Sequence, residues 1–279
     1  MTASRVAAGQ PVVQFHGKWP FARLGGAQEP LSVLFSLANL WAHARGLRRI
    51  RRAIPASYPA RPYYVALALI SCAAWVLSAV FHARDFRLTE RLDYFGAGAT
   101  VLYGLYYTVV RLARLYRPGA DGRRRSVLRL WTLICAALYA AHVGFLTLVR
   151  WDYGYNMAAN VAVGAVQNAL WSAYSVRRWR RTGRPWAAWP GLAVAWLVMA
   201  MGLELFDFPP LWGALDAHSL WHAGTVAPAV LWYKCVVPAL SLPPSSFGCR
   251  RGLALTAASS QFPGQGRAGR YRRRRRRWR

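Results

Sequence analysis

Acidic residues and lysine are scarce in this chain. Its 279 residues include nine Asp and Glu against 37 Lys and Arg, and the only lysines are Lys18 and Lys234. The resulting net charge of +28 would by itself suggest a nucleic-acid-binding protein. The arginines, however, gather in short stretches between long apolar segments, where membrane topology accounts for them. We therefore expect no nucleic-acid partner.

Cysteine is also rare, and the four cysteines show neither a pairing pattern nor the spacing of a zinc site. Three of them lie inside apolar segments, where free cysteine commonly acts as a small core residue. The cysteines are Cys72, Cys135, Cys235 and Cys249. The cysteines are therefore interpreted as small core residues, and they do not indicate a redox compartment.

A secretory signal peptide is not visible in residues 1–28, which are polar to mixed. They lack a positively charged start followed by an apolar core of about 7–15 residues. We expect either that the first apolar segment acts as the insertion signal or that the natural N-terminus lies upstream. Residues 1–28 are interpreted as a luminal N-terminal segment.

Apolar and aromatic residues are abundant. The chain is 55% hydrophobic, with 14 Trp, 14 Tyr and 11 Phe, and its long apolar runs alternate with short polar connections. This composition is typical of a polytopic membrane protein. We predict an all-α fold with seven transmembrane helices in one membrane domain, residues 29–240. The predicted spans are 30–44, 63–82, 92–110, 127–149, 155–176, 186–206 and 218–240.

The distribution of arginine predicts how these spans are oriented. The connections after the first, third and fifth spans hold six, six and five arginines, whereas those after the second, fourth and sixth hold three, one and none. The positive-inside rule places the arginine-rich connections and the C-terminus in the cytosol. The N-terminus and the other connections then face the lumen, and this alternation requires an odd number of spans.

Residues 241–279 differ in kind from the rest of the chain. They are rich in Pro, Ser, Gly and Arg, include six consecutive arginines at 272–277, and show no sustained periodicity. We predict a disordered basic cytosolic tail. A solvated tail is the favoured interpretation, and binding to anionic lipid headgroups is the alternative.

Five polar side chains converge on the luminal ends of three predicted spans. His218 and His222 are four residues apart at the start of the seventh span, so their rings share one helical face. His82 closes the second span, with Ser78 one turn deeper on the same face, and Asp93 opens the third. Polar and ionisable residues within or bordering spans are functional candidates by default.

These residue types fit a metal-dependent hydrolase. Three neutral imidazoles and one water form the ligand set of a catalytic zinc, which lowers the pKa of the water to about 7 and supplies a hydroxide nucleophile. We predict that His82, His218 and His222 bind zinc, an ion favoured by an all-imidazole shell. Asp93 would orient the water or accept its proton, and Ser78 would donate to the developing oxyanion. No Glu directly follows His218, so the zinc-protease motif is absent.

Nearby carboxylates are candidate partners for the imidazole N–H groups. Three of these candidates are Asp85, Glu90 and Asp207. Asp216 lies two residues before His218, a spacing at which two side chains on a helix do not face each other.

A plainer interpretation exists for each residue alone: a ring anchoring a helix end, histidines bonding across helices, a small packing serine, or an acid in a helix's first turn. His142 is predicted to be a packing residue. Asn160 and Gln167 are predicted to form hydrogen bonds between helices.

Several longer motifs resemble the Per1-like family (post-GPI attachment to proteins factor 3), within the CREST superfamily of seven-span membrane hydrolases. The Ser-x3-His, Asp and His-x3-His residues resemble the superfamily signature. The motifs that resemble the Per1-like family are His16-Gly-Lys-Trp-Pro-Phe21, Gln28-Glu-Pro30, Val80-Phe-His-Ala-Arg-Asp85, Leu88-Thr-Glu-Arg-Leu-Asp-Tyr-Phe95, Asp152-Tyr-Gly-Tyr-Asn-Met-Ala-Ala-Asn160, Asp207-Phe-Pro-Pro-Leu211 and Leu215-Asp-Ala-His218. They follow the family order from about residue 14 to about residue 235.

The resemblance implies a function. Members of the family remove the sn-2 acyl chain from the phosphatidylinositol of GPI-anchored proteins, a phospholipase A2-type reaction. The substrate would be GPI-anchored proteins in the bilayer, with zinc on His82, His218 and His222 beside Ser78 and Asp93. The expected location is the Golgi membrane, with the endoplasmic reticulum as the alternative. Two other classes stay open, a non-enzymatic seven-span receptor with a structural metal and a ceramidase.

Two departures from the family accompany this resemblance. The family normally begins with a signal peptide and a cysteine-rich luminal segment, whereas here 15 residues without cysteine precede His16. It also normally ends soon after the seventh span, without a polyarginine tail.

Overall fold

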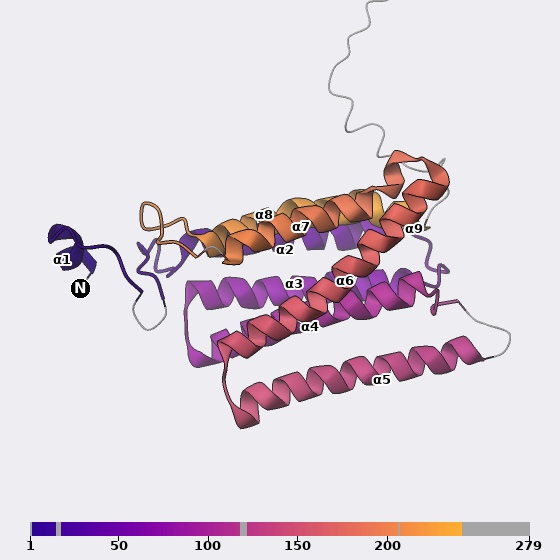
Figure 1. Cartoon of the computed structure of the whole chain (residues 1–279), viewed down its shortest axis with the longest axis horizontal. Helices are drawn as coiled ribbons and strands as arrows, with labels where there is room; N and C mark the ends of the chain where they lie inside the picture. The colour runs from indigo at the N-terminus through magenta and orange to yellow at the C-terminus, as the bar shows by residue number, and fades with distance from the viewer. Residues whose placement is uncertain (1, 15–17, 118–121, 206, 242–279) are drawn as a thin grey trace, which may run out of the picture. The chain divides into compact units, whose positions relative to one another are not determined.

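The structure is a computed structural model that describes residues 2–14, 18–117, 122–205 and 207–241 (Figure 1). The predicted tail lies outside the described residues, apart from Ser241. Two isolated β-bridges are the only extended pairing among the described residues, so the predicted all-α class is confirmed. The helices are α1 (Thr2–Ala7), α2 (Pro30–Ala53), α3 (Arg61–Ala83), α4 (Arg87–Leu112), α5 (Arg123–Gly144), η1 (Phe145–Val149), α6 (Tyr153–Thr182), η2 (Pro185–Ala187), α7 (Trp189–Leu205), α8 (Ala217–Leu231), η3 (Trp232–Val236) and α9 (Val237–Ser241).

Each of the seven predicted spans coincides with one long helix, α2 to α8, and the last helix continues through η3 into α9. Among the described residues, three helical segments are long and apolar enough to cross a membrane by length and composition: α3, α5 with η1, and α8 through α9. Helix α7 is apolar but has only 17 residues. Helices α2, α4 and α6 are longer and carry arginines near their ends, which lowers their mean hydropathy.

The predicted ends of the first and fifth spans were too early. Helix α2 continues to Ala53 and α6 continues to Thr182, so the arginine clusters after residues 44 and 176 lie on helices rather than in loops. Arginine is a good helix former, and basic side chains in a last turn complement the helix dipole. Composition marks where an apolar segment ends, but the helical backbone continues past that point.

Two aspartates cap the N-terminal ends of α6 and α8 and so mark where these two helices begin. Asp152 precedes α6 and accepts a hydrogen bond from the Tyr155 amide at 3.0 Å. Asp216 precedes α8 and forms a capping box with Ser219, with a 2.9 Å bond to the Ser219 amide. Such caps satisfy amides that have no partner within the helix. The Asp216 cap fixes where α8 begins and therefore on which face of this helix His218 and His222 lie.

Six of the long helices form a closed ring by their packing. Helix α2 packs on α3, α3 on α4, α4 on α6, α6 on α7, α7 on α8, and α8 returns to α2. Helix α5 packs on α4 outside this ring and is seen at its edge in Figure 1. Side chains that point into the ring can therefore meet even when their helices are far apart in sequence.

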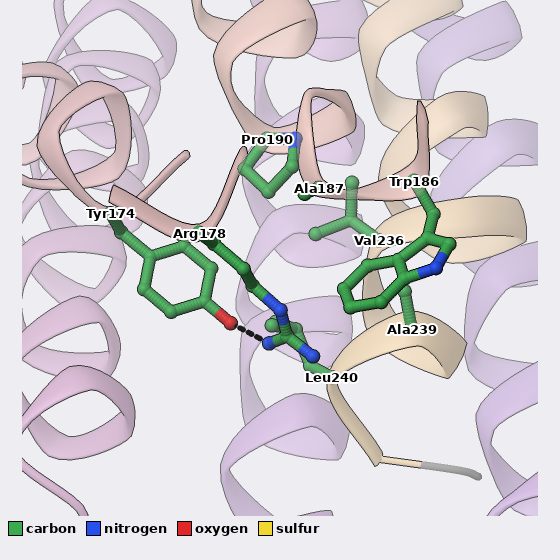
Figure 2. Close-up of a pocket in the computed structure, with 8 residues that line it drawn as sticks. All are labelled: Tyr174, Arg178, Trp186, Ala187, Pro190, Val236, Ala239 and Leu240. Atoms are coloured by element: carbon green, nitrogen blue, oxygen red, sulfur yellow. Dashed lines mark hydrogen bonds between the residues drawn. The ribbon is translucent and has the colours of Figure 1, made fainter. Parts of the chain in front are cut away.

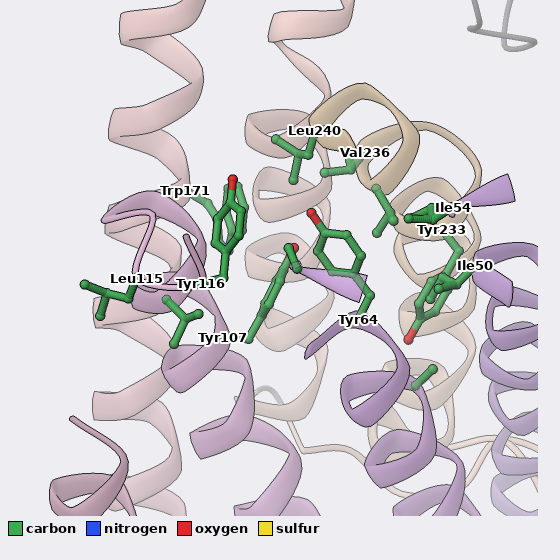
Figure 3. Packing of buried hydrophobic residues seen from close by; sticks show 14 of the residues in the cluster. Ile50, Ile54, Tyr64, Tyr107, Leu115, Tyr116, Trp171, Tyr233, Val236 and Leu240 are labelled. Carbon is green, nitrogen blue, oxygen red and sulfur yellow. The ribbon is translucent and has the colours of Figure 1, made fainter. Parts of the chain in front are cut away.

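The end of the ring away from the predicted site is filled with buried aromatic and aliphatic side chains (Figure 3). Tyr64, Tyr107 and Trp171 are almost fully buried there, and the Trp171 indole donates to the Thr108 hydroxyl at 2.8 Å. A buried Trp needs such a partner for its N–H. Dense packing of this kind makes this end resistant to rearrangement.

Arg111 ties the last helix to this aromatic end. Its guanidinium donates to the hydroxyls of Tyr64 and Tyr116, each at 3.1 Å, and to the backbone carbonyl of Leu240 in α9. A cation at a helix C-terminus is favoured by the helix dipole. The arginine therefore stabilises the C-terminal end of the last span.

A close approach between α2 and η3 gives a test of this packing. A Cβ at Gly46 would lie 2.3 Å from ring atoms of Tyr233, whose hydroxyl bonds His43 at 2.9 Å and resists displacement. We expect Gly46→Ala to lower the free energy of unfolding by about 1–3 kcal/mol. A Cβ at Gly164 meets nothing within 4 Å, so Gly164→Ala should leave stability unchanged or slightly raised. Thermal unfolding in detergent measures both, and equal midpoints for the two variants would contradict the packing.

Candidate metal centre

The structure brings the three predicted metal ligands together. His82 lies near the C-terminal end of α3, and His218 and His222 lie in the first turns of α8. The ring centroids of His218 and His222 are 4.5 Å apart, and the His82 ring is 5.1 and 5.0 Å from them. One ligand atom from each ring lies within 4.8 Å of the others. Three imidazoles from two helices thus face one common point.

The outer nitrogen of each ring has a hydrogen-bond acceptor. His82 Nδ1 lies 2.6 Å from Glu29 Oε2, and His218 Nδ1 lies 2.7 Å from Glu204 Oε2. His222 Nδ1 lies 3.0 Å from the Ser36 hydroxyl. A neutral imidazole carries one N–H, and an ionised carboxylate can only accept, so the proton belongs on Nδ1 of His82 and His218. This leaves the Nε2 lone pairs of these two rings for the centre, as in metal-binding histidines.

The inner nitrogens have the separation that a shared metal requires. His82 Nε2 and His218 Nε2 are 3.3 Å apart. Two nitrogens bound tetrahedrally to one zinc at about 2.0–2.1 Å would be about 3.3–3.4 Å apart. The same separation allows an N–H···N hydrogen bond when one of the two rings carries a proton on Nε2. The donor set and its spacing therefore fit a zinc ion.

Glu29 is held as an acceptor by its surroundings. Burial by itself would raise the pKa of this carboxyl, but the hydrogen bond with His82 and the nearby Lys18 cation bring the pKa below its usual value. The carboxylate lies at the N-terminal end of α2, where the helix dipole also favours negative charge. Glu29 is therefore ionised at neutral pH and accepts the proton of His82 Nδ1.

Sequence reasoning missed Glu29, Glu204 and Ser36. The carboxylates expected to bond the imidazoles have other partners: Asp85 pairs with Lys18, and Asp207 accepts from the Trp19 indole at 2.6 Å. Asp216 caps α8, in agreement with its exclusion on helix geometry, and no bond from Glu90 to an imidazole is seen in the described structure. The available signal was Glu204, an acid inside an otherwise apolar segment and thus a functional candidate.

Ser78 and Asp93 lie beside the three rings, as predicted. The Ser78 hydroxyl is 3.2 Å from the Ser36 hydroxyl, and the Asp93 carboxyl interacts with Ser78 as well as with His82 and His218. If His222 Nδ1–H donates to Ser36, then Ser36 is left to donate to Ser78. The Ser78 proton then points onward to Asp93. With that tautomer the hydrogen-bond chain runs from the ring to the carboxylate.

Two buried polar contacts hold α8 at this register. The buried Asn39 amide donates to the His222 carbonyl at 2.7 Å and accepts from the Thr225 hydroxyl at 3.1 Å. The Trp75 ring meets the His222 ring edge-on at 5.2 Å. These contacts fix His222 before any ligand binds.

The three histidines are unevenly exposed. The His82 side chain is 3% exposed, whereas the His218 side chain is 37% exposed. Structural zinc sites are closed by four protein ligands, whereas catalytic sites keep one position open. The uneven exposure fits a site that a small molecule can reach past His218.

The other polar positions singled out by the sequence lie elsewhere. His142 lies beside Tyr155, with its Nδ1 3.4 Å from the hydroxyl, and does not reach the centre. Asn160 bonds the Asn156 carbonyl at 2.9 Å within its own helix, so the prediction of a bond between helices was wrong for this residue. Gln167 packs against Gly104 of α4. His16 lies outside the described residues.

A small cavity lies at the opposite end of the helices, between α6, α7 and the last span (Figure 2). Its volume is about 10 Å³, enough for about one water. The Arg178 guanidinium lies over the Trp186 ring there, 4.3 Å from its centroid. This cavity is too small for a lipid substrate, so the histidine cluster is the better candidate site.

The fold and the site define a seven-helix membrane protein with a three-histidine candidate metal centre at one end of a six-helix ring. The sequence model of the Per1-like family matches residues 1–239, and the chain belongs to that family. It is 46% identical to "Protein PER1 homolog" of Schizosaccharomyces pombe over 230 residues, which is 81% of this chain and 67% of that protein. It is 43% identical to the Bos taurus and 41% identical to the Homo sapiens "GPI-specific phospholipase A2-like PGAP3", each over 81% of this chain and 68% of the relative.

The hydrogen bonds that the histidines form through Nδ1, on the side away from the centre, can be tested by measuring zinc affinity. We expect Glu204→Gln to weaken zinc binding about 10- to 100-fold, because the His218 ring loses the carboxylate that orients it. Asp207→Asn is the matched control, since this carboxylate bonds Trp19 and Gln14 rather than an imidazole. Chelator competition with zinc quantification on purified protein measures both affinities. Equal affinities for the two variants would rule out the assigned role of Glu204.

Proposed function

We propose that this protein is a GPI-specific phospholipase A2-type hydrolase that removes the sn-2 acyl chain of the phosphatidylinositol in GPI-anchored proteins. The observation that carries the proposal is the three-histidine centre, open past His218, in a chain 41–46% identical to relatives named PER1 homolog and GPI-specific phospholipase A2-like. The function is GPI-anchor lipid remodelling, and the substrates are GPI-anchored proteins.

The three histidines would hold a zinc ion through their Nε2 atoms. When bound, zinc would activate a water for attack on the ester carbonyl. Glu29, Glu204 and Ser36 keep the Nδ1 protons in place, so the rings present lone pairs to the centre without reorganisation. A preorganised site of this kind needs no rearrangement during the reaction.

Ser78 and Asp93 would carry the proton and charge changes of ester hydrolysis. Asp93 accepts a proton from the attacking water as the new C–O bond forms, and it returns that proton to the glycerol oxygen when the ester bond breaks. The products are a free fatty acid and a lysophospholipid anchor. The Ser78 hydroxyl turns from Asp93 to donate to the carbonyl oxygen as negative charge develops there.

Ser36 would determine the direction of the Ser78 proton. Ser36 contacts both His222 and Ser78, and if it accepts from His222 and donates to Ser78, the Ser78 oxygen is occupied as an acceptor. Its own proton is then free to donate to Asp93 or to the substrate. Hydrogen bonds in such a chain polarise one another, so the chain strengthens the donor at its far end.

The arginine distribution supports a location for this chemistry. The arginine-rich C-terminal ends of α2 and α6 and the arginine-rich start of α5 would face the cytosol, which puts the N-terminus and the histidine centre at the luminal side and the C-terminus in the cytosol. GPI anchors are displayed on the luminal leaflet, so substrate and site would meet there. We propose the Golgi membrane as the compartment, with the endoplasmic reticulum as the alternative.

The alternatives have separate signatures. A receptor with a structural metal would need a closed ligand shell, whereas His218 is partly exposed. A ceramidase would cleave an amide with the same residue types, and membership in the Per1-like family favours the GPI substrate over ceramide.

The lipid composition of a GPI-anchored reporter tests the function. Cells lacking the endogenous activity would receive the intact chain, the His222→Ala variant or the His142→Ala variant. We expect the intact chain and His142→Ala to shift the anchor from unsaturated to lyso or saturated forms, because His142 lies outside the centre. His222→Ala should lose at least about 100-fold of the activity, since it removes a metal ligand. Mass spectrometry measures the anchor, and normal remodelling by His222→Ala would contradict the proposal.

A further inference from the structure

The connection between α7 and α8 presents an unusually exposed apolar turn. Residues 211–215 form a tight turn closed by a bridge between Leu211 and Leu215, and Trp212 at its tip is 88% exposed. Leu211 is 48% exposed. A neighbouring turn closed by Leu24 and Ala27 exposes Leu24 by 73%, and the two turns are joined by the Ala22 amide bonding the Gly213 carbonyl at 2.7 Å. We call Leu24, Leu211 and Trp212 the apolar rim.

The turn is held rigidly in an unfavourable backbone conformation. Trp212 has a φ of 53°, the left-handed region that bulky residues rarely adopt. The Leu211 amide bonds the Leu215 carbonyl at 2.7 Å, and the Gly213 amide bonds the Pro210 carbonyl at 3.2 Å. Strain of this kind persists only where the surroundings impose it, and it is concentrated at functional positions. The turn therefore holds the indole outward.

The length of α7 bears on the depth of the turn. A helix of 17 residues is about 25 Å long, which is shorter than the hydrocarbon core of about 30 Å. If α7 begins at the opposite boundary of the bilayer, a turn that closely follows α7 lies near the boundary on its own side. Trp is enriched at this boundary, where its apolar body meets acyl chains and its N–H meets polar groups. Depth and residue type together favour lipid as the contact of the rim.

The turn also lies between the two elements that form the accessible side of the metal centre. Glu204 is near the end of α7, before the turn, and it bonds His218. Asp216 follows the turn directly and caps α8, two residues before His218, the most exposed of the three histidines. The position of the turn in the bilayer thus determines the depth at which the open side of the centre lies.

We propose that the apolar rim inserts into the leaflet that carries the substrate and holds the open side of the metal centre at the depth of the glycerol esters. The partner is the boundary between the glycerol and acyl layers of the bilayer. This role rests on the proposed hydrolase function, because an sn-2 ester lies at that boundary. The phosphoinositol, glycan and protein parts of the substrate would then remain outside the rim.

Spin labelling tests the lipid contact without reference to activity. Trp212→Cys and, as control, Arg84→Cys would each carry a nitroxide in the full chain reconstituted in phosphatidylcholine nanodiscs. The unmutated chain treated with the same label supplies the background from native cysteines. Arg84 is the exposed residue that ends α3 near the same centre. We expect the label at 212 to be relaxed by oxygen and shielded from a water-soluble nickel complex, with the opposite result at 84.

A label at 212 as accessible to nickel as the label at 84 overturns the proposal. So does a nickel-accessible label that becomes shielded only when a water-soluble GPI glycan is added, because the rim would then bind the headgroup. Shielding that disappears on dilution to one chain per nanodisc also overturns it, because the contact would be a second copy of the chain.

Kinetics test the link to substrate depth. In phosphatidylcholine vesicles carrying a GPI-anchored reporter, we expect Trp212→Ser to raise the apparent KM about tenfold with a smaller change in kcat. Trp212→Phe, which keeps an apolar ring, should restore most of the loss. An unchanged KM in Trp212→Ser overturns the role in substrate access. If the intact chain hydrolyses nothing, the proposed function fails, whereas the labels still decide whether the rim enters the leaflet.

Discussion

Three hydrogen bonds on the outer nitrogens of three histidines are the constraint on which the rest of this structure depends. Each Nδ1 has a hydrogen-bond partner, and the Nε2 atoms of His82 and His218 face one another 3.3 Å apart inside a medium that screens poorly. A shared metal ion fits this separation. The acceptors Glu29, Ser36 and Glu204 are contributed by α7 and by α2 with its N-terminal end, so the metal centre and the closure of the helix ring require each other.

The two ends of the ring differ in how they are built. One end is filled with aromatic side chains and tied to the last helix by Arg111, so it has little room to rearrange. The other end is polar, accessible past His218, and covered by turns that expose Trp212. The rigid packing at the aromatic end supports the polar end, where the imidazole nitrogens and the strained backbone of Trp212 are kept in position. Helix α5 lies outside the ring and contributes none of the residues assigned to the site.

Periodicity was enough to find the seven helices and the facing pair His218 and His222, because both depend on contacts within one helix. It did not find where α2 and α6 end, because arginine continues a helix after the apolar segment stops. It also missed Ser36, whose partner His222 is 186 residues away. Such pairings depend on which helices become neighbours in the ring. The expectation for Asn160 was wrong for the opposite reason, since its amide finds an acceptor one turn away on its own helix rather than on a neighbouring one.

X-ray absorption at the zinc edge of the purified intact chain tests the central claim most directly. The account predicts a zinc ion with three imidazole nitrogens at about 2.0–2.1 Å and one further oxygen ligand from water. Such a shell would show that the three Nε2 atoms hold the metal and leave a position for chemistry. A shell with sulfur, a shell of four protein ligands, or a purified chain that retains no zinc when zinc is supplied would contradict it.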